Sequence, residues 1–233
     1  MTNKNIINSQ FYKILRYGYF FLASNLLFIL ANLLFLIVFI TFPPRLEFSI
    51  IYLIALIPLG PALTALFFSM GQLVRTGDLA PVKDFARAYR SNFWLSLKYW
   101  LLQLTLSAIL FIDAIYFYQR DWQILAAVFL VLFLLVCLFS LIGFPLIATF
   151  EIELKSIYQA TVVVIWQYAL KQLVNLLTIV ALAIIFWAFP SELFLFLFSL
   201  IAFYVMRHNQ NMFEALAEQF SQPAPEGDDP LDD

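Results

Sequence analysis

Charged residues are scarce in this 233-residue sequence, since Asp, Glu, Lys and Arg together make up 12% of it. A soluble domain has about 25% charged residues, so this chain lacks the side chains that would cover a water-facing surface. Hydrophobic residues instead account for 64% of the sequence, and 27 residues are phenylalanines. The composition excludes a water-soluble globular protein, a disordered regulator and a nucleic-acid-binding domain, so no nucleic acid is expected as a partner.

The residues that build catalytic and metal sites are also few. One cysteine, Cys137, allows neither an internal disulfide nor a CxxC pair, and His208 is the one histidine. None of the patterns HExxH, GxSxG, P-loop or GxGxxG occurs in a chain with six glycines. We therefore expect no catalytic residues, no metal and no cofactor, and a protein that is not an enzyme.

Long apolar stretches are abundant. A helix of about 20 apolar residues crosses the hydrocarbon core, because its backbone satisfies its own hydrogen bonds there. The sequence predicts an all-α fold, a polytopic membrane helix bundle with about six transmembrane helices, in a transmembrane domain over residues 1–207. The predicted spans lie near residues 18–42, 49–74, 99–118, 123–150, 172–189 and 192–207. The last is the shortest, and a re-entrant hairpin with the fifth is the alternative.

The basic residues orient these spans. Cytoplasmic loops carry an excess of Lys and Arg, and a cytoplasmic N-terminus places eleven of the thirteen Lys and Arg inside, leaving only Arg45 and Arg120 outside. A multi-pass protein with both termini in the cytoplasm is therefore predicted. The last segment, 208–233, holds seven of the fifteen acids. It is predicted to continue the last helix briefly and then to be a disordered acidic tail from about residue 221.

Three polar-faced segments flank the predicted spans, at residues 6–16, 81–93 and 155–170. Each has apolar side chains at helical spacing on one face and basic residues elsewhere, the pattern of an amphipathic helix at a membrane surface. They are interpreted either as anchors on the inner surface or as a docking site for another protein. The candidate partner-contact residues are Lys83, Phe85, Arg87, Tyr89, Arg90, Phe93, Lys155, Tyr158 and Lys171.

Polar residues and helix breakers inside spans are the remaining candidates, because polar groups are costly in lipid and broken helices mark transporter sites. Asn25 and Asn32 are seven residues apart and so share one face, which predicts a buried polar seam in the first span. Contact between helices is favoured over ligand binding. The candidate polar residues are Asn25, Asn32, Gln103, Asp113 and Asn175. The candidate breaks or kinks are at Pro58, Gly60, Pro61, Gly143 and Pro145.

Several segments in order resemble one bacterial family. They are residues 11–17 (FYKILRY), Asn25 with the two leucines after it, 61–67 (PALTALF), 82–93 (VKDFARAYRSNF) and 144–151 (FPLIATFE), followed by Leu154 and Lys155. In this order and spacing, the chain resembles the YesL family of membrane proteins over roughly residues 11–205. The two proline-containing segments are the most specific, and the acidic tail lies outside the resemblance.

The resemblance implies a small multi-span protein of the bacterial cell membrane, largely of Gram-positive bacteria, often encoded beside carbohydrate importers and glycan-degrading enzymes. The leading expectation is therefore a non-enzymatic accessory protein associated with carbohydrate ABC import, with the lipid bilayer and ABC transporter subunits as partners. One alternative is a small transporter or membrane substrate-binding subunit in its own right. A second is a structural or sensory membrane protein.

Overall fold

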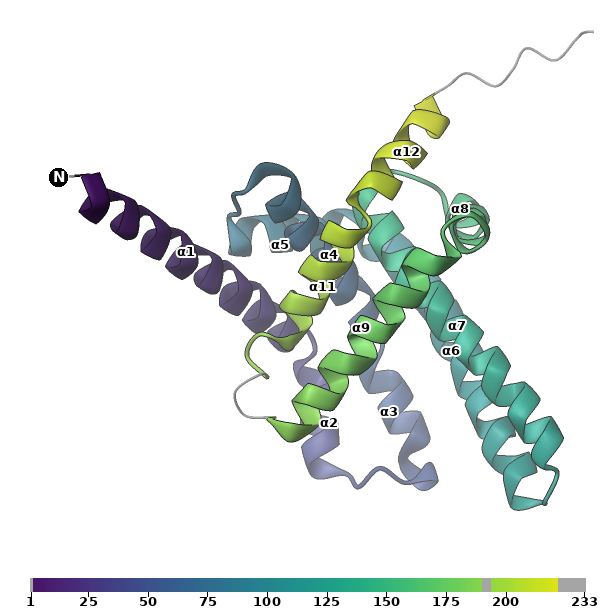
Figure 1. Ribbon diagram of the computed structural model, residues 1–233. Helices are drawn as coiled ribbons and strands as arrows, with labels where there is room; N and C mark the ends of the chain where they lie inside the picture. The colour runs from purple at the N-terminus through teal and green to yellow at the C-terminus, as the bar shows by residue number, and fades with distance from the viewer. Residues whose placement is uncertain (1, 190–193, 222–233) are drawn as a thin grey trace, which may run out of the picture.

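The structure is a computed structural model that describes residues 2–189 and 194–221, and these are helical apart from short connections (Figure 1). The elements are α1 (Thr2–Ala31), α2 (Leu33–Thr41), η1 (Leu46–Phe48), α3 (Ser49–Ala55), α4 (Leu59–Thr76), α5 (Pro81–Ser91), α6 (Phe93–Gln119), α7 (Gln123–Thr149), α8 (Leu154–Gln167), α9 (Ala169–Ala188), α11 (Leu197–His208) and α12 (Gln210–Ser221). The all-α fold predicted from the sequence is confirmed. The tail predicted to be disordered falls on residues 222–233, outside the described part.

Five helical stretches within the described residues are long and apolar enough to cross a membrane: Tyr12–Ala31, Ser49–Thr76, Phe93–Gln119, Gln123–Thr149 and Ala169–Ala188. The predicted sixth span, 192–207, corresponds to α11, which has only 12 residues. The first two residues of the predicted span, 192–193, lie outside the described part. A multi-pass membrane protein in contact with the bilayer follows from these helices. The number of spans and the side on which the termini lie stay predictions.

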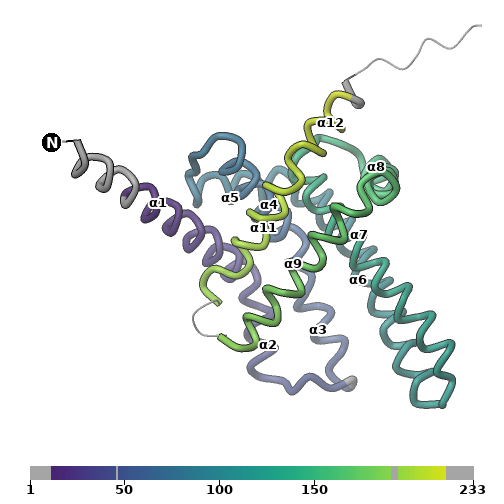
Figure 2. The backbone as a smooth tube through the Cα atoms, in the orientation of Figure 1, coloured from purple at the N-terminus to yellow at the C-terminus, as the bar shows by residue number. Residues whose placement is uncertain are grey.

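The connections between the long helices gather at two ends of the molecule. Figure 2 shows the α2–α3 connection and the α6–α7 turn at one end, whereas α5, α8 and α12 lie at the other. Lys83, Arg87 and Arg90 on α5 and Lys155 on α8 are exposed there. We call this the basic end, and the predicted topology would place it in the cytoplasm.

Helix α4 lies at the centre of the bundle and packs against α1, α5, α6, α7 and α11. Its small residues, among them Ala62, Ala65 and Ser69, are fully buried and let neighbouring backbones approach closely. The larger Leu66 and Met70 fill the space between these approaches and are also buried. The α4 part of the second predicted span is therefore the core of the bundle, whereas Ile50 and Ile54 in the α3 part are exposed.

The break predicted in this span occurs between α3 and α4, where α3 ends at Ala55 and α4 begins at Leu59. The carbonyl of Leu56 accepts from the Leu59 N–H at 3.1 Å and also from Trp100 Nε1 on α6 at 2.7 Å. Gly60 lies against the same tryptophan, and a Cβ at this position would overlap the Trp100 side chain. An indole and a glycine thus let the broken span pack directly on α6.

Helix α7 runs unbroken from Gln123 to Thr149 with Pro145 inside it, so of the break or kink predicted at Gly143 and Pro145 the structure shows no break. The Tyr99 hydroxyl donates to the carbonyl of Phe139 at 2.7 Å, and a Cβ on Gly143 would overlap the Tyr99 ring. Gly143 therefore serves close packing against α6 rather than interruption of the helix.

The first predicted span also differs from the structure, in which α1 ends at Ala31 and α2 begins at Leu33. Asn32 forms the junction, and its side-chain amide donates to the carbonyl of Phe28 at 2.8 Å. The segment 6–16, predicted as a short interfacial helix leading into the first span, forms one continuous helix with that span in α1. Local backbone competition by the asparagine side chain explains the division at Asn32.

Candidate functional site

Helix α5 presents a charged face at the basic end. Its Phe85 and Ala88 are buried in the core of the bundle, and Tyr89 is half-buried, where burial raises the pKa of its phenol. Lys83, Arg87 and Arg90 are exposed on the other side of the helix. Phe85, predicted as a partner-contact residue, is therefore unavailable to a partner. Phe93 begins α6 and is not part of the amphipathic helix, which ends at Ser91.

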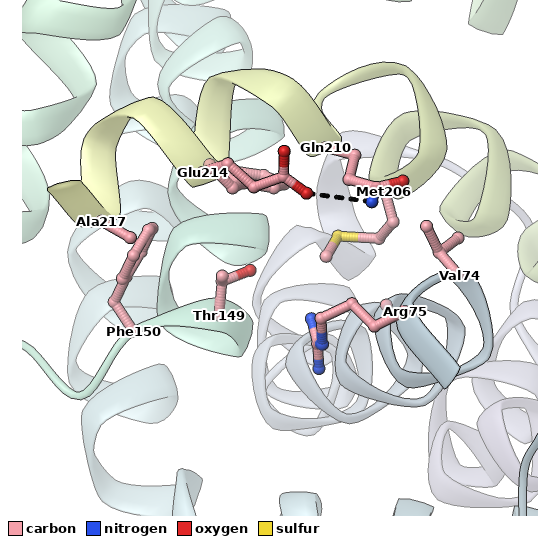
Figure 3. Close-up of a pocket in the computed structure, with 10 residues that line it drawn as sticks. Val74, Arg75, Thr149, Phe150, Met206, Gln210, Glu214 and Ala217 are labelled. Atoms are coloured by element: carbon pink, nitrogen blue, oxygen red, sulfur yellow. Dashed lines mark hydrogen bonds between the residues drawn. The ribbon is translucent and has the colours of Figure 1, made fainter. Parts of the chain in front are cut away.

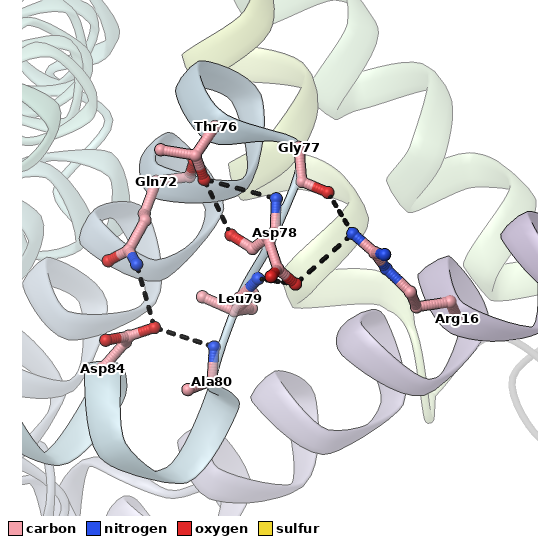
Figure 4. A network of polar contacts seen from close by, with 8 residues as sticks. All are labelled: Arg16, Gln72, Thr76, Gly77, Asp78, Leu79, Ala80 and Asp84. Carbon is pink, nitrogen blue, oxygen red and sulfur yellow. Dashed lines mark hydrogen bonds and ion pairs between the residues drawn. The ribbon is translucent and has the colours of Figure 1, made fainter.

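The start of α5 is fixed by a buried carboxylate (Figure 4). Asp84, 4% exposed, accepts hydrogen bonds from the backbone N–H of Ala80 at 2.8 Å and from Gln72 Nε2 at 3.0 Å. The first bond satisfies a backbone donor at the helix start, as a capping carboxylate does, and the second ties α5 to α4. The orientation of α5 is therefore set by groups inside the bundle.

The loop between α4 and α5 is held from the other side by α1. Gly77 ends α4 in the left-handed conformation, at φ 69°, which glycine adopts without steric cost. Arg16 donates to the Gly77 carbonyl at 2.7 Å and pairs with Asp78 at 3.3 Å, as Figure 4 shows. Because both side chains of the ion pair reach solvent, the pair itself contributes at most about 1 kcal/mol. Its main effect is to fix the loop against α1.

Helix α8 also uses its apolar stripe within the molecule. Ile157, Thr161 and Val164 are buried, and the helix packs mainly on α7. Lys155 remains exposed, and Tyr158 is half-buried in ring contact with Tyr99. The apolar stripes on α5 and α8, for which the sequence indicated no partner, thus pack against the bundle. The exposed side chains of these helices include Lys83, Arg87, Arg90 and Lys155 as well as the apolar Val82 and Trp166.

A cavity of about 460 Å³ lies at the basic end between α4, α7, α11 and α12 (Figure 3). Arg75 extends into it from α4, and Glu214 and Gln210 from α12. The Glu214 carboxylate accepts from Gln210 Nε2 at 3.0 Å, whereas Arg75 forms no ion pair with an acid among the described residues. The cavity therefore combines one cation and one carboxylate with an otherwise largely apolar lining.

The polar candidates inside the spans do not meet in one site. Asn25 bridges helices, since its side-chain oxygen accepts from the backbone N–H of Phe198 at 3.1 Å and of Ser199 at 3.2 Å, and its amide donates to the Phe194 carbonyl at 2.9 Å. Among the residues that the structure describes, the Asn32 side chain bonds only to the Phe28 carbonyl, four residues earlier. The two asparagines therefore form no common seam.

Asn175 is the centre of a buried network that joins α9 to the end of α11. Its amide donates to Gln172 Oε1 at 3.0 Å and to Asn209 Oδ1 at 3.2 Å, while its oxygen lies 2.7 Å from His208 Nδ1. Because an amide oxygen only accepts, this contact assigns the proton to Nδ1. Gln172 and Asn209 were not singled out in the sequence, although Gln172 and Asn175 share a helix face by their spacing of three residues.

The remaining candidates are separate from this network. Gln103 is buried between α6 and α8 and donates to the Tyr158 hydroxyl at 3.2 Å. Asp113 is half-buried on α6 and has no hydrogen bond or ion pair among the described residues. Lys171 lies 5.9 Å from the Tyr168 ring centroid. Within residues 2–189 and 194–221, no group of three His, Cys, Asp or Glu side chains could hold a metal ion.

These features define a polytopic helical membrane protein whose α5 and α4–α5 loop are held by polar contacts at the basic end. Residues 46–114 match the family model described as "Protein of unknown function, DUF624". Comparison with curated proteins and with solved structures gave no match. The matched stretch runs from η1 into α6, so it includes the α3–α4 break, the loop held by Arg16 and the whole of α5.

Proposed function

We propose that this chain is a non-enzymatic accessory protein of a carbohydrate ABC importer in the bacterial cell membrane, with both termini in the cytoplasm. The match over residues 46–114 falls inside the region that resembles the YesL family, and that resemblance suggests carbohydrate uptake. The proposed contact is between the exposed face of α5 and an acidic surface of a transporter subunit. No chemistry at a catalytic centre is required for such a role.

The observation that carries this proposal is the fixed basic face of α5. Lys83, Arg87 and Arg90 are spaced by four and three residues, so they share one exposed side of the helix. Asp84 and Phe85 hold the opposite side inside the bundle. Because α5 is already ordered, binding of a partner would not incur the entropic cost of ordering it. Its three fixed charges could then be recognised by a complementary acidic surface.

The triple substitution Lys83→Gln, Arg87→Gln and Arg90→Gln tests this contact. Each exposed charge contributes about 0.2–1 kcal/mol to binding. Loss of all three is therefore expected to lower the affinity for the partner about tenfold. The measurement is co-purification in mild detergent with the subunits of a carbohydrate ABC importer from the same organism, at low and high salt. Addition of salt should weaken the wild-type complex as well.

A matched control removes the two basic residues assigned to the opposite end, by Arg45→Gln with Arg120→Gln. This variant is expected to co-purify like the wild type. Equal recovery of the partner with the α5 triple variant and with the control would contradict the proposed contact. Unchanged sugar uptake after deletion of the whole chain would contradict the accessory role itself.

The alternative function, a transporter or substrate-binding subunit, is favoured by the cavity between α4 and α12. Arg75 and Glu214 on its walls would suit a small ligand that carries both an anionic and a hydrogen-bonding group. Purified protein in liposomes separates the two functions, because substrate flux without any partner would support the alternative. Loss of that flux on Asp113→Asn would assign a role to the half-buried carboxylate of α6.

A further inference from the structure

One face of α6 carries a stripe of apolar side chains that reach the outside of the bundle. Leu102, Leu106, Ile109 and Tyr116 follow one another at intervals of four, three and seven residues, so they share a face of the helix. They are 53%, 43%, 52% and 46% exposed, respectively. Figure 1 shows the half of the α6–α7 hairpin that is remote from the basic end extending away from α9. With α6 treated as a membrane span, this face meets lipid or another membrane helix rather than water.

Asp113 interrupts this stripe. It comes four residues after Ile109 and three before Tyr116, so it lies on the same face. It is the only Asp or Glu in the five long apolar stretches of the described residues. Its side chain is half-buried and has no hydrogen bond or ion pair within that part of the chain. Because an unpaired carboxylate is costly in lipid, contact with lipid alone does not account for an acid on this face.

The position of Asp113 along α6 places it inside the hydrocarbon layer. Lys98 near the start of the helix is exposed, and Tyr118 near its end is 70% exposed, as expected for residues at the two interfaces. The helix rises about 30 Å between them, which is the thickness of the hydrocarbon core. Asp113 comes five residues before Tyr118 and so lies about 7–8 Å inside that layer. Unlike Lys or Arg, it has no long stem with which to reach water.

The described part of the chain supplies no cation at this depth. The basic residues of the five apolar stretches all lie towards the basic end, and they are Lys13, Arg16, Arg75, Lys98 and Lys171. Arg45 and Arg120 belong to the connections at the other end, where both are exposed. Copies of one chain insert in the same direction, so a second copy would bring apolar residues or another Asp113 to this position. A cation for Asp113 therefore has to come from outside this chain.

A basic side chain on another helix suits this face better than a metal ion does. A metal ion in an oxygen site needs several ligands, and the neighbouring Leu106 and Ile109 offer none. A membrane-spanning helix with Lys or Arg instead brings apolar residues above and below its charge, which would cover the exposed side chains on either side of Asp113. One such helix satisfies both the carboxylate and the apolar stripe.

We propose that the Asp113 stripe (Leu102, Leu106, Ile109, Asp113 and Tyr116) is the docking face for a transmembrane helix of a different protein, and that this helix carries Lys or Arg at the depth of Asp113. The ion pair fixes the depth of the partner helix, and the apolar side chains cover its sides. This surface is separate from the proposed contact through α5, and the inference does not depend on that contact. Salt distinguishes the two, because charges inside lipid are screened much less than exposed ones.

The test uses the full chain co-expressed with a single-span probe helix of about 20 leucines, in which one arginine replaces the leucine about five residues from the outer end. Basic residues at the N-terminus of the probe orient it like α6. We expect about tenfold more of this probe than of an all-leucine probe to co-purify with the chain in mild detergent, at low and at high salt alike. Equal recovery of the two probes would overturn the proposal.

Variants assign the effect to the carboxylate. Asp113→Leu should lower recovery of the arginine probe to that of the all-leucine probe. Asp113→Lys should instead recover a probe with aspartate in place of its arginine, and this swap separates loss of the ion pair from loss of the fold.

Asp121→Asn is the matched control. Asp121 is an exposed acid in the α6–α7 turn, outside the apolar part of the hairpin, and asparagine tolerates its left-handed φ of 62°. This variant should recover the arginine probe like the wild type. Release of the probe by high salt, or equal recovery by Asp113→Leu and the wild type, would refute an ion pair within the membrane.

Discussion

Replacement of Gly60 with alanine is expected to destabilise the protein more than any other single-methyl addition to its glycines. The new Cβ would overlap Cβ of Trp100, which is attached directly to the α6 backbone, so relief requires α4 and α6 to move apart. Overpacking of this kind costs about 1–3 kcal/mol, and the lack of a movable neighbour places Gly60→Ala at the upper end. The measurement is the midpoint of thermal unfolding in detergent, followed by near-ultraviolet circular dichroism.

The same methyl group at Gly18 provides the control. A Cβ there would meet nothing within 4 Å, and the residue lies inside α1. Alanine is favoured over glycine in a helix by about 0.5–1 kcal/mol, so Gly18→Ala should be neutral or slightly stabilising. A Gly60→Ala protein that unfolds at the same temperature as Gly18→Ala would show that α4 and α6 are not in close contact.

The hydrophobic pattern was sufficient to predict the all-α membrane fold, because long apolar runs have few other structures open to them in lipid. It was not sufficient to tell the two proline segments apart. Pro58 lies between α3 and α4, whereas Pro145 lies within an unbroken α7. Both segments contact α6, through Trp100 and Tyr99, so the presence of a contact with α6 does not distinguish them either.

The amphipathic stripes are a second feature that the hydrophobic pattern predicted only in part. Periodicity correctly marked apolar faces on the segments that form α5 and α8, but it could not say what covers them. Phe85 and Ile157 turn out to be core residues, because the ends of α4 and α7 leave space that these helices fill. The basic residues on the outer face could be predicted, since a charged side chain stays in water wherever the helix packs.

Asn25 of α1 and Asn32 at the junction of α1 and α2 show why the polar candidates could not be ranked. Asn25 and Asn32 are the same residue type, both are buried, and their spacing puts them on one face. Their difference comes from a segment about 170 residues further along the chain, at the start of α11. Asn25 occupies the position of an N-terminal cap supplied in trans by another helix, and no local pattern predicts such a partner.

Substitution of Asn25 by leucine is therefore expected to detach α11 from α1. The change leaves two backbone donors, Phe198 N–H and Ser199 N–H, and the Phe194 carbonyl without their partner in an apolar setting. Each orphaned group costs about 1–3 kcal/mol. The measurements are the unfolding midpoint in detergent and the rate of backbone hydrogen exchange at Phe198 and Ser199, which should rise strongly when the cap is lost.

Asn25→Asp and Asn32→Leu separate the cap from a general effect of a buried asparagine. Asn25→Asp keeps an acceptor for both N–H groups and loses only the bond to the Phe194 carbonyl, so its exchange rates at Phe198 and Ser199 should stay closer to the wild type than those of Asn25→Leu. Asn32→Leu removes an amide whose oxygen is unpaired and should leave stability unchanged or higher. If Asn25→Leu and Asn32→Leu unfolded alike, the start of α11 would not depend on Asn25, and the association of α1 with α11 would have to be assigned to apolar packing such as the Phe28–Phe198 ring contact.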